Sequence, residues 1–194
     1  PRRFGKSMAA NMLTAYYSRG CDSADLFKNL AISKTEDFKK HLNKYNVIRL
    51  DIRSYISSNE DPMKIRENVT EDLLYEISEE YPDVKMPPRI TLEKALATVY
   101  IKTGIPFIFI IDEWDCVFRV FPKNVEAQTV YLNFLRDLLK EKEYVALNYA
   151  TGIFPVKKYG EHSALNMYHE YTMTNQKRFA EYTGFTDKEV KMLC

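Results

Sequence analysis

The stretch PFIFIIDEWD, residues 106–115, constrains the fold more than any other part of the chain. Phe107 to Ile111 are apolar at every position, without the alternation expected of a strand that has one face in water. Such a run is typical of a strand buried on both faces in a parallel sheet. The run ends in Asp112 and Glu113, and ligands of open parallel sheets bind beyond the carboxyl ends of the strands. The sequence therefore predicts a functional site at these carboxylates; a strand that simply stops at two exposed acidic residues is the alternative.

The rest of the chain predicts helices that alternate with two further strands. The strands are expected at Val47 to Ile52 and at Tyr144 to Ala150. Helices are expected from Ser7 onward, from Glu36 to Tyr45, from Pro62 to Tyr81, between a Thr91 cap and Gly104, and from Val125 to Lys142. This alternation predicts an α/β fold in which right-handed crossovers join the strands of a parallel sheet.

A Gly-Lys-Ser triplet at residues 5–7 resembles the end of a phosphate-binding loop, G-x-x-x-x-G-K-[ST]. The first glycine of that motif would precede Pro1, so it cannot be checked. Because a G-K-[ST] triplet is expected by chance in roughly one chain in ten of this length, an ordinary basic N-terminus is the alternative. The helix expected from Ser7 and the distant Asp112–Glu113 pair supply the context that the motif requires.

The two motifs together predict roles for five side chains. Lys6 would neutralise the β- and γ-phosphates, while Ser7 and Asp112 would hold Mg²⁺. Glu113 would orient and deprotonate the attacking water. Thr151, at the end of the following strand, would sense the γ-phosphate, or it simply begins the turn at Gly152.

Several other polar residues leave two interpretations open. Arg2 and Arg3 either neutralise phosphate or form a solvated basic pair. Trp114 and Asp115 follow the carboxylates closely enough to shape the site, although core packing is the simpler role for Trp114. The three histidines show no metal-binding spacing.

Composition excludes several classes of protein. The chain has 28 Lys and Arg against 27 Asp and Glu, so it lacks the overall basic charge of a dedicated nucleic-acid binder, although a local patch remains open. Its cysteines, Cys21, Cys116 and Cys194, favour neither a disulfide framework nor a zinc site, which predicts a reducing, cytoplasmic location. No run approaches the roughly 18 apolar residues that cross a bilayer, so no membrane partner is expected.

With these residues in hand, the sequence resembles the AAA-ATPase-like proteins of anaerobic bacteria, a branch of the P-loop ATPases. The resemblance rests on PRRFGKS at 1–7, HLNKYNVIRLDI at 41–52, FIIDEWD at 109–115, ATGIFPVKKYG at 150–160, SALNMYHEYTM at 163–173 and GFTDKEVKMLC at 184–194. In that family the loop reads R-P-R-R-F-G-K-[ST], which lacks the first glycine, and a tyrosine commonly stands where this chain has Trp114.

The resemblance implies a three-layer P-loop NTPase fold whose first strand is missing from this chain. It also implies an AAA-like ATPase core over residues 1–174, with a short last strand at His169 to Met173, and the start of a helical lid over residues 175–194. Thr186 to Glu189 independently form a capping box for a helix there. A C-terminal nuclease-like domain of the PD-(D/E)xK type is often fused in the family, and a homo-oligomer is left open.

The function expected from the sequence is ATP binding and Mg²⁺-dependent hydrolysis that drives a conformational or assembly change in a larger protein. The cofactor-binding residues would be Gly5, Lys6, Ser7 and Thr151. One alternative is a nucleotide-gated or degenerate scaffold module without significant turnover. Another is a small-molecule phosphotransferase, for which no acceptor pocket is legible in the sequence.

Overall fold

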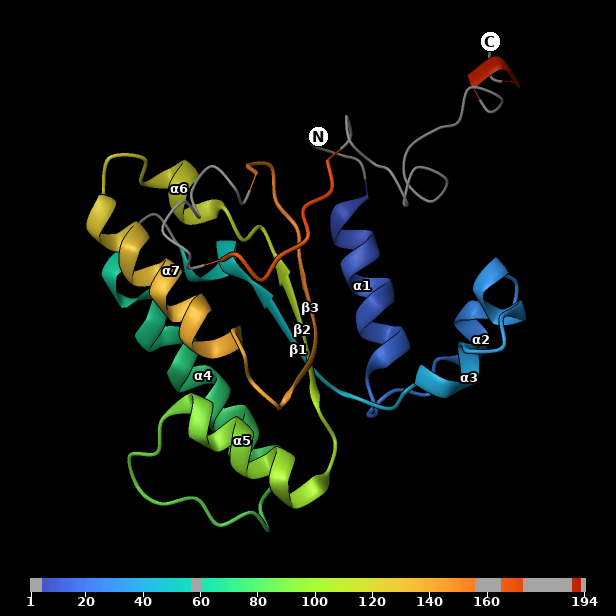
Figure 1. Cartoon of the computed structure of the whole chain (residues 1–194), viewed down its shortest axis with the longest axis horizontal. Coiled ribbons are helices and arrows are strands. Elements are labelled where there is room, and N and C mark those ends of the chain that lie inside the picture. The colour runs from blue at the N-terminus through green and yellow to red at the C-terminus, as the bar shows by residue number, and fades with distance from the viewer. Residues whose placement is uncertain (1–4, 57–60, 156–164, 173–189, 193–194) are drawn as a thin grey trace.

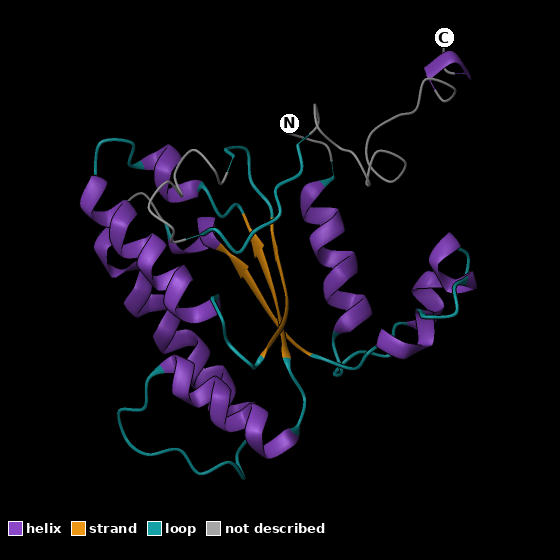
Figure 2. Cartoon of the chain, in the orientation of Figure 1, coloured by secondary structure: helices purple, strands orange, loops and turns teal. Residues whose placement is uncertain are grey.

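The computed structural model describes residues 5–56, 61–155, 165–172 and 190–192. Within these residues, three strands form a single parallel sheet that lies between two layers of helices (Figures 1 and 2). Helix α1 covers one face of the sheet, and helices α4, α5 and α7 cover the other (Figure 1). The predicted α/β fold with a parallel sheet is therefore confirmed.

The strands are β1 (Asn46–Asp51), β2 (Phe107–Asp112) and β3 (Val145–Ala150), in the spatial order β1-β2-β3. Every residue of β2 is buried, as its uninterrupted apolar sequence predicts. Asp51 pairs with Asp112 in the register of β1 and β2, so both strands end at the same level of the sheet. The described chain begins directly before α1, and the strand expected ahead of the loop stays a prediction.

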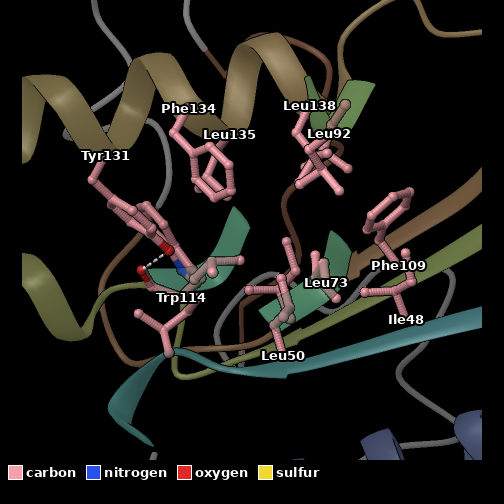
Figure 3. Close-up of a cluster of buried hydrophobic side chains, with 14 of the residues drawn as sticks. Ile48, Leu50, Leu73, Leu92, Phe109, Trp114, Tyr131, Phe134, Leu135 and Leu138 are labelled. Atoms are coloured by element: carbon pink, nitrogen blue, oxygen red, sulfur yellow. Dashed lines mark hydrogen bonds between the residues drawn. The ribbon is translucent and has the colours of Figure 1, made fainter. Parts of the chain in front are cut away.

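The central strand is apolar throughout because its two faces meet different helices. Ile108 and Ile110 point to the side of α1 (Lys6–Tyr17), where they pack with Ala10. Phe109 and Ile111 point the opposite way, as the two-residue period of a strand requires, into the larger core. That core is built with α4 (Ile65–Glu80), α5 (Leu92–Thr103) and α7 (Val125–Leu139), as Figure 3 shows for part of it.

The boundaries of α5 follow its capping residues. The Thr91 hydroxyl accepts a hydrogen bond from the Lys94 backbone N–H at 3.4 Å, and Gly104 closes the helix with a φ of 69°. Both ends agree with the sequence prediction. The predicted helix from Pro62 is also present, as a short 3₁₀ turn, η3 (Pro62–Lys64), followed by α4.

Shorter elements connect the layers. Helices α2 (Ala24–Phe27) and α3 (Phe38–His41), with η1 (Ala31–Lys34) between them, follow α1 and form a small separate aromatic cluster with it. The 3₁₀ turn η2 (Ile52–Tyr55) follows β1, and α6 (Cys116–Val120) follows β2. None of the helices in the described part of the chain is long and apolar enough to cross a membrane.

The structure corrects three of the predicted elements. The helix expected from Glu36 to Tyr45 forms only at α3, because Asn43 adopts a left-handed φ of 54° and its side-chain amide donates to the Ala15 and Ser18 carbonyls. Helix α7 ends at Leu139 and not at Lys142, since Lys140 is extended and φ of Glu141 is 56°. In place of the last strand expected at His169 to Met173, only Thr172 forms a β-bridge within residues 169–172.

Some predictions fall outside the described residues. These are the roles of Arg2 and Arg3, the part of the last strand at Met173, and the capping box at Thr186 to Glu189. The predicted lid lies outside them as well, apart from residues 190–192, which are helical. The proposed boundary between core and lid at residues 174 and 175 stays a prediction.

Candidate functional site

An open cleft of about 470 Å³ lies between the beginning of α1 and the segments that follow the three strands. In Figure 1 the N-terminal end of α1 and helix α6 lie at the end of the sheet toward which β1 and β2 point. The lining residues are Gly5, Lys6, Ser7, Met8, Arg53, Glu113, Arg119 and Ile153. The cleft therefore occupies the position where parallel sheets bind ligands.

The first wall of the cleft is the start of α1. Gly5 precedes the helix with a left-handed φ of 75°, and its carbonyl accepts the Ala9 N–H at 2.8 Å. A β-carbon at Gly5 would meet no atom within 4 Å, so the need for glycine comes from the backbone conformation and not from crowding. Lys6 and Ser7 occupy the first turn, where helix N–H groups lack intrahelical partners and the helix dipole favours an anion.

The second wall is the turn that follows β2. Asp112 is buried, with an exposed fraction of 2 %, and its Oδ1 accepts the Glu113 backbone N–H at 3.0 Å. Glu113 has a φ of 53°, a left-handed conformation that costs a residue with a side chain roughly 1–2 kcal/mol. The Cys116 N–H closes the turn on the Glu113 carbonyl at 2.9 Å. The chain therefore turns sharply at the residue predicted to be the catalytic base.

The core holds this turn in place through Trp114. The Trp114 backbone N–H donates to the Thr151 carbonyl at 3.1 Å. The Trp114 backbone carbonyl accepts a hydrogen bond from the Tyr131 hydroxyl at 2.8 Å (Figure 3). Burial raises the pKa of Tyr131 well above its ordinary value, so its hydroxyl remains a protonated donor. The core packing expected of Trp114 is thus confirmed.

Asp115 joins the turn to the loop after β3. Its carboxylate is fully buried, and Oδ2 accepts the N–H groups of Ile153 at 3.1 Å and Phe154 at 2.9 Å. Gly152 lies against the same side chain, since a β-carbon there would fall 2.5 Å from Asp115 Oδ1 and 2.7 Å from Trp114 Cδ1. Glycine is therefore required at this position by close approach.

The cleft carries an excess of positive charge. Among its lining residues are three basic side chains, Lys6, Arg53 and Arg119, and one carboxylate, Glu113. Asp51, whose carboxylate lies 3.2 Å from Arg53 Nη2, raises the pKa of that guanidinium. Arg119 forms an ion pair with Glu113, and its Nε donates to Asp115 Oδ2 at 3.1 Å. Lysine, arginine and a helix N-terminus in one cleft are the groups that bind phosphate.

A family model described as a predicted AAA-ATPase matches residues 1–160 of the chain. The chain belongs to this family. Membership supports a nucleotide-binding ATPase, which agrees with the phosphate-binding chemistry of the cleft. No curated protein and no solved structure matches the sequence.

Two of the residues predicted for the site lie outside the lining of the cleft. Asp112 and Thr151 are both buried, with exposed fractions of 2 % and 6 %. The Thr151 N–H extends the ladder of β3 by donating to the Ile111 carbonyl at 2.8 Å, while its buried Oγ1 has no hydrogen-bond partner among the described residues. The structure thus brings Gly5, Lys6, Ser7 and Glu113 to one cleft and leaves Asp112 and Thr151 buried outside its lining.

The donors available in this chain fit Mg²⁺ held jointly with a nucleotide. Within the described residues, no three His, Cys, Asp or Glu side chains gather into a metal-binding group. Mg²⁺ commonly takes only one or two protein oxygens and completes its shell with phosphate oxygens and water. A Ser7 hydroxyl and an Asp112 carboxylate match that requirement.

Sequence reasoning missed Met8, Arg53, Arg119 and Ile153 as lining residues of the cleft. Arg119 carried a usable signal, because it follows Asp115 by four residues, the spacing of an ion pair on one helix face. That signal depends on recognising α6, a helix of only five residues. Arg53 and Ile153 carried none, because their place depends on where β1 and β3 end in space.

Proposed function

We propose that the protein binds ATP and hydrolyses it with Mg²⁺, and that hydrolysis drives a conformational or assembly change in a larger protein. The observation that carries the proposal is the cleft in which Gly5, Lys6 and Ser7 meet Glu113. Glu113 lies more than 100 positions after the other three residues in the sequence. A phosphate-binding helix start opposite a carboxylate is the arrangement that phosphoryl transfer to water needs.

Lys6 and the first turn of α1 would hold the triphosphate. The left-handed backbone of Gly5 lets the chain enter the helix without a side chain beside the ligand. The ammonium group of Lys6 would neutralise the β- and γ-phosphates in both the ground state and the transition state. Removing that charge should therefore weaken nucleotide binding itself.

Ser7 and Asp112 would hold the metal ion, by the hydroxyl directly and by the carboxylate through water. When bound, Mg²⁺ would offset the charge that develops on the phosphate oxygens. Asp112 is suited to a fixed position because its Oδ1 accepts the Glu113 N–H at 3.0 Å, which leaves Oδ2 for a second interaction. The buried Thr151 hydroxyl, which has no partner among the described residues, would respond to the γ-phosphate.

Glu113 would act as the general base. A water oxygen attacks the γ-phosphorus, the bond between that phosphorus and the β–γ bridging oxygen breaks, and the water proton passes to the Glu113 carboxylate. General-base catalysis of this kind contributes roughly 10²- to 10⁴-fold in rate. The left-handed φ of 53° turns the chain at Glu113, and this residue lines the cleft, which supports the assignment.

A second function, a nucleotide-gated scaffold without significant turnover, is favoured by one observation. Glu113 is ion-paired with Arg119, and its side chain is only 19 % exposed. A carboxylate oxygen engaged by a guanidinium is not available to accept a hydrogen bond from the attacking water. If the pair persists when ATP binds, the site binds nucleotide without hydrolysing it.

The test compares nucleotide affinity and single-turnover phosphate release for the full-length wild type, Glu113→Gln and Lys6→Ala. Glu113→Gln keeps the size of the side chain but cannot take a proton, so it should bind ATP near normally and hydrolyse it about 10²- to 10⁴-fold more slowly. Lys6→Ala should lose binding. If the wild type binds ATP but releases phosphate no faster than Glu113→Gln, the protein is a nucleotide-gated scaffold and not an ATP hydrolase.

A further inference from the structure

Arg119 lies in the proposed ATP site without a role in the mechanism above. It comes from α6, the short helix after β2, and lines the same cleft as Lys6 and Ser7. Its side chain is 20 % exposed, so the guanidinium is mostly enclosed yet reachable from the cleft. Its signal in the sequence is the spacing of four residues from Asp115.

The contacts of Arg119 differ in how firmly they hold it. Nε donates to Asp115 Oδ2 at 3.1 Å, and that carboxylate is fully buried and tied to the backbone of Ile153 and Phe154. Nη2 donates to Glu113, a residue that lines the cleft, and Nη1 has no hydrogen-bond partner among the described residues. The guanidinium therefore has one fixed anchor at Nε and one exchangeable contact, between Nη2 and Glu113.

The charge around Arg119 favours such an exchange. One guanidinium now serves two carboxylates, Glu113 and Asp115. The terminal phosphate of ATP carries more negative charge than a carboxylate and presents several acceptor oxygens, which a guanidinium binds through two parallel hydrogen bonds. ADP lacks that terminal group. A triphosphate in the cleft can thus compete with Glu113 for Nη2 and also accept from Nη1, whereas a diphosphate lacks the phosphate that would do so.

We infer that Arg119 is a ligand of the γ-phosphate of ATP and releases Glu113 when that phosphate arrives, while its Nε remains on Asp115. This inference rests on the proposed function, because it assigns a further ligand of the same nucleotide. It also explains how a carboxylate that is ion-paired in this structure becomes available to accept a proton from water. Without the γ-phosphate, Arg119 keeps Glu113 engaged.

A purely structural role would give Arg119 the task of neutralising the buried Asp115 carboxylate. Loss of that support would loosen the loop at Ile153 and Phe154 and would weaken the binding of ATP and ADP alike. Loss of a γ-phosphate ligand would weaken the binding of ATP and leave the affinity for ADP nearly unchanged. The ratio of the two affinities therefore separates the two roles.

The experiment measures the dissociation constants of the full-length protein for Mg²⁺ with ADP and with the non-hydrolysable β,γ-imido analogue of ATP. Arg119→Gln should weaken binding of the analogue about 10- to 100-fold, the effect of one lost charge-assisted hydrogen-bonded contact, with ADP changed less than about threefold. Arg119→Lys keeps the charge near Asp115 but not the two-pronged geometry, so it should show a smaller loss with the same preference. Arg136→Gln, on α7 with its guanidinium on Asp137 and Asn133, is the matched control and should change neither constant.

Each result supports or overturns the inference. A selective loss for the ATP analogue in Arg119→Gln, or in Arg119→Lys if the first variant does not fold, supports it. An equal loss of affinity for both nucleotides overturns the inference, but the proposed function of ATP binding and hydrolysis still stands. A wild type that binds neither nucleotide overturns the proposed function and this inference together.

Discussion

Replacing Gly152 by alanine places one methyl group against two side chains of the site. The new β-carbon would fall 2.5 Å from Asp115 Oδ1, 2.7 Å from Trp114 Cδ1 and 2.8 Å from Trp114 Nε1. Contacts between carbon and oxygen or carbon atoms are normally about 3.5 Å or longer. The overlap therefore approaches 1 Å with each of two side chains, and at least one of them must move.

Neither neighbour moves easily. Trp114 is 3 % exposed, packs against the ring of Phe118, and has both its backbone N–H and its carbonyl in hydrogen bonds. Asp115 is fully buried and holds two backbone N–H groups and the Arg119 guanidinium through Oδ2. Relief of the clash has to break contacts that fix the loop after β3 to the turn after β2.

The cost follows from these contacts. Forcing a methyl group into a packed interior costs about 1–3 kcal/mol, and weakening one hydrogen bond to a buried carboxylate adds about 1.5–3 kcal/mol. We expect Gly152→Ala to lower the free energy of unfolding by about 2.5–6 kcal/mol. For a chain of this size that corresponds to a fall in Tm of roughly 5–24 °C.

The assay is thermal unfolding followed by the fluorescence of Trp114, the single tryptophan of the chain. Gly20→Ala is the matched control, because a β-carbon there meets only Ser18 Oγ, at 3.9 Å. The control should shift the free energy of unfolding by less than about 0.5 kcal/mol. If Gly152→Ala unfolds at the same temperature as Gly20→Ala, the close approach between Gly152 and the Asp115 turn is wrong.

Two further predictions concern the buried residues outside the lining of the cleft. Asp112→Ala should remove most of the Mg²⁺ dependence of ATP binding, so that calorimetry with and without EDTA gives nearly equal affinities; a wild type that is itself insensitive to EDTA would contradict the metal assignment. Thr151→Val removes a buried hydroxyl that has no partner among the described residues, so the free energy of unfolding should not fall, while single-turnover phosphate release should fall if the hydroxyl senses the γ-phosphate. Unchanged phosphate release in Thr151→Val would make Thr151 only the residue that begins the turn.

The strands and long helices were predictable because local pattern and tertiary burial agree there. The apolar run at Phe107 to Ile111 has one stable location, between two helix layers, and it became the central strand. The spacing of Val69, Leu73 and Ile77 defines one helix face, and all three side chains are buried. Element ends were less predictable where a distant contact decides them, as at Asn43, whose amide bonds to the carbonyls at the end of α1.

In the candidate site too, local features were predictable from the sequence and contacts between distant segments were not. By itself the sequence determined a glycine directly before a helix, a lysine and a serine at the start of that helix, and a carboxylate at the end of the most apolar strand, because each depends on its immediate neighbours. Only the tertiary structure decided that Arg119 faces Glu113, that Asp115 holds the loop at Ile153 and Phe154, and that Gly152 has no room for a side chain. These contacts join segments that follow different strands, and their partners are set by how the carboxyl ends of the parallel strands meet at one edge of the sheet.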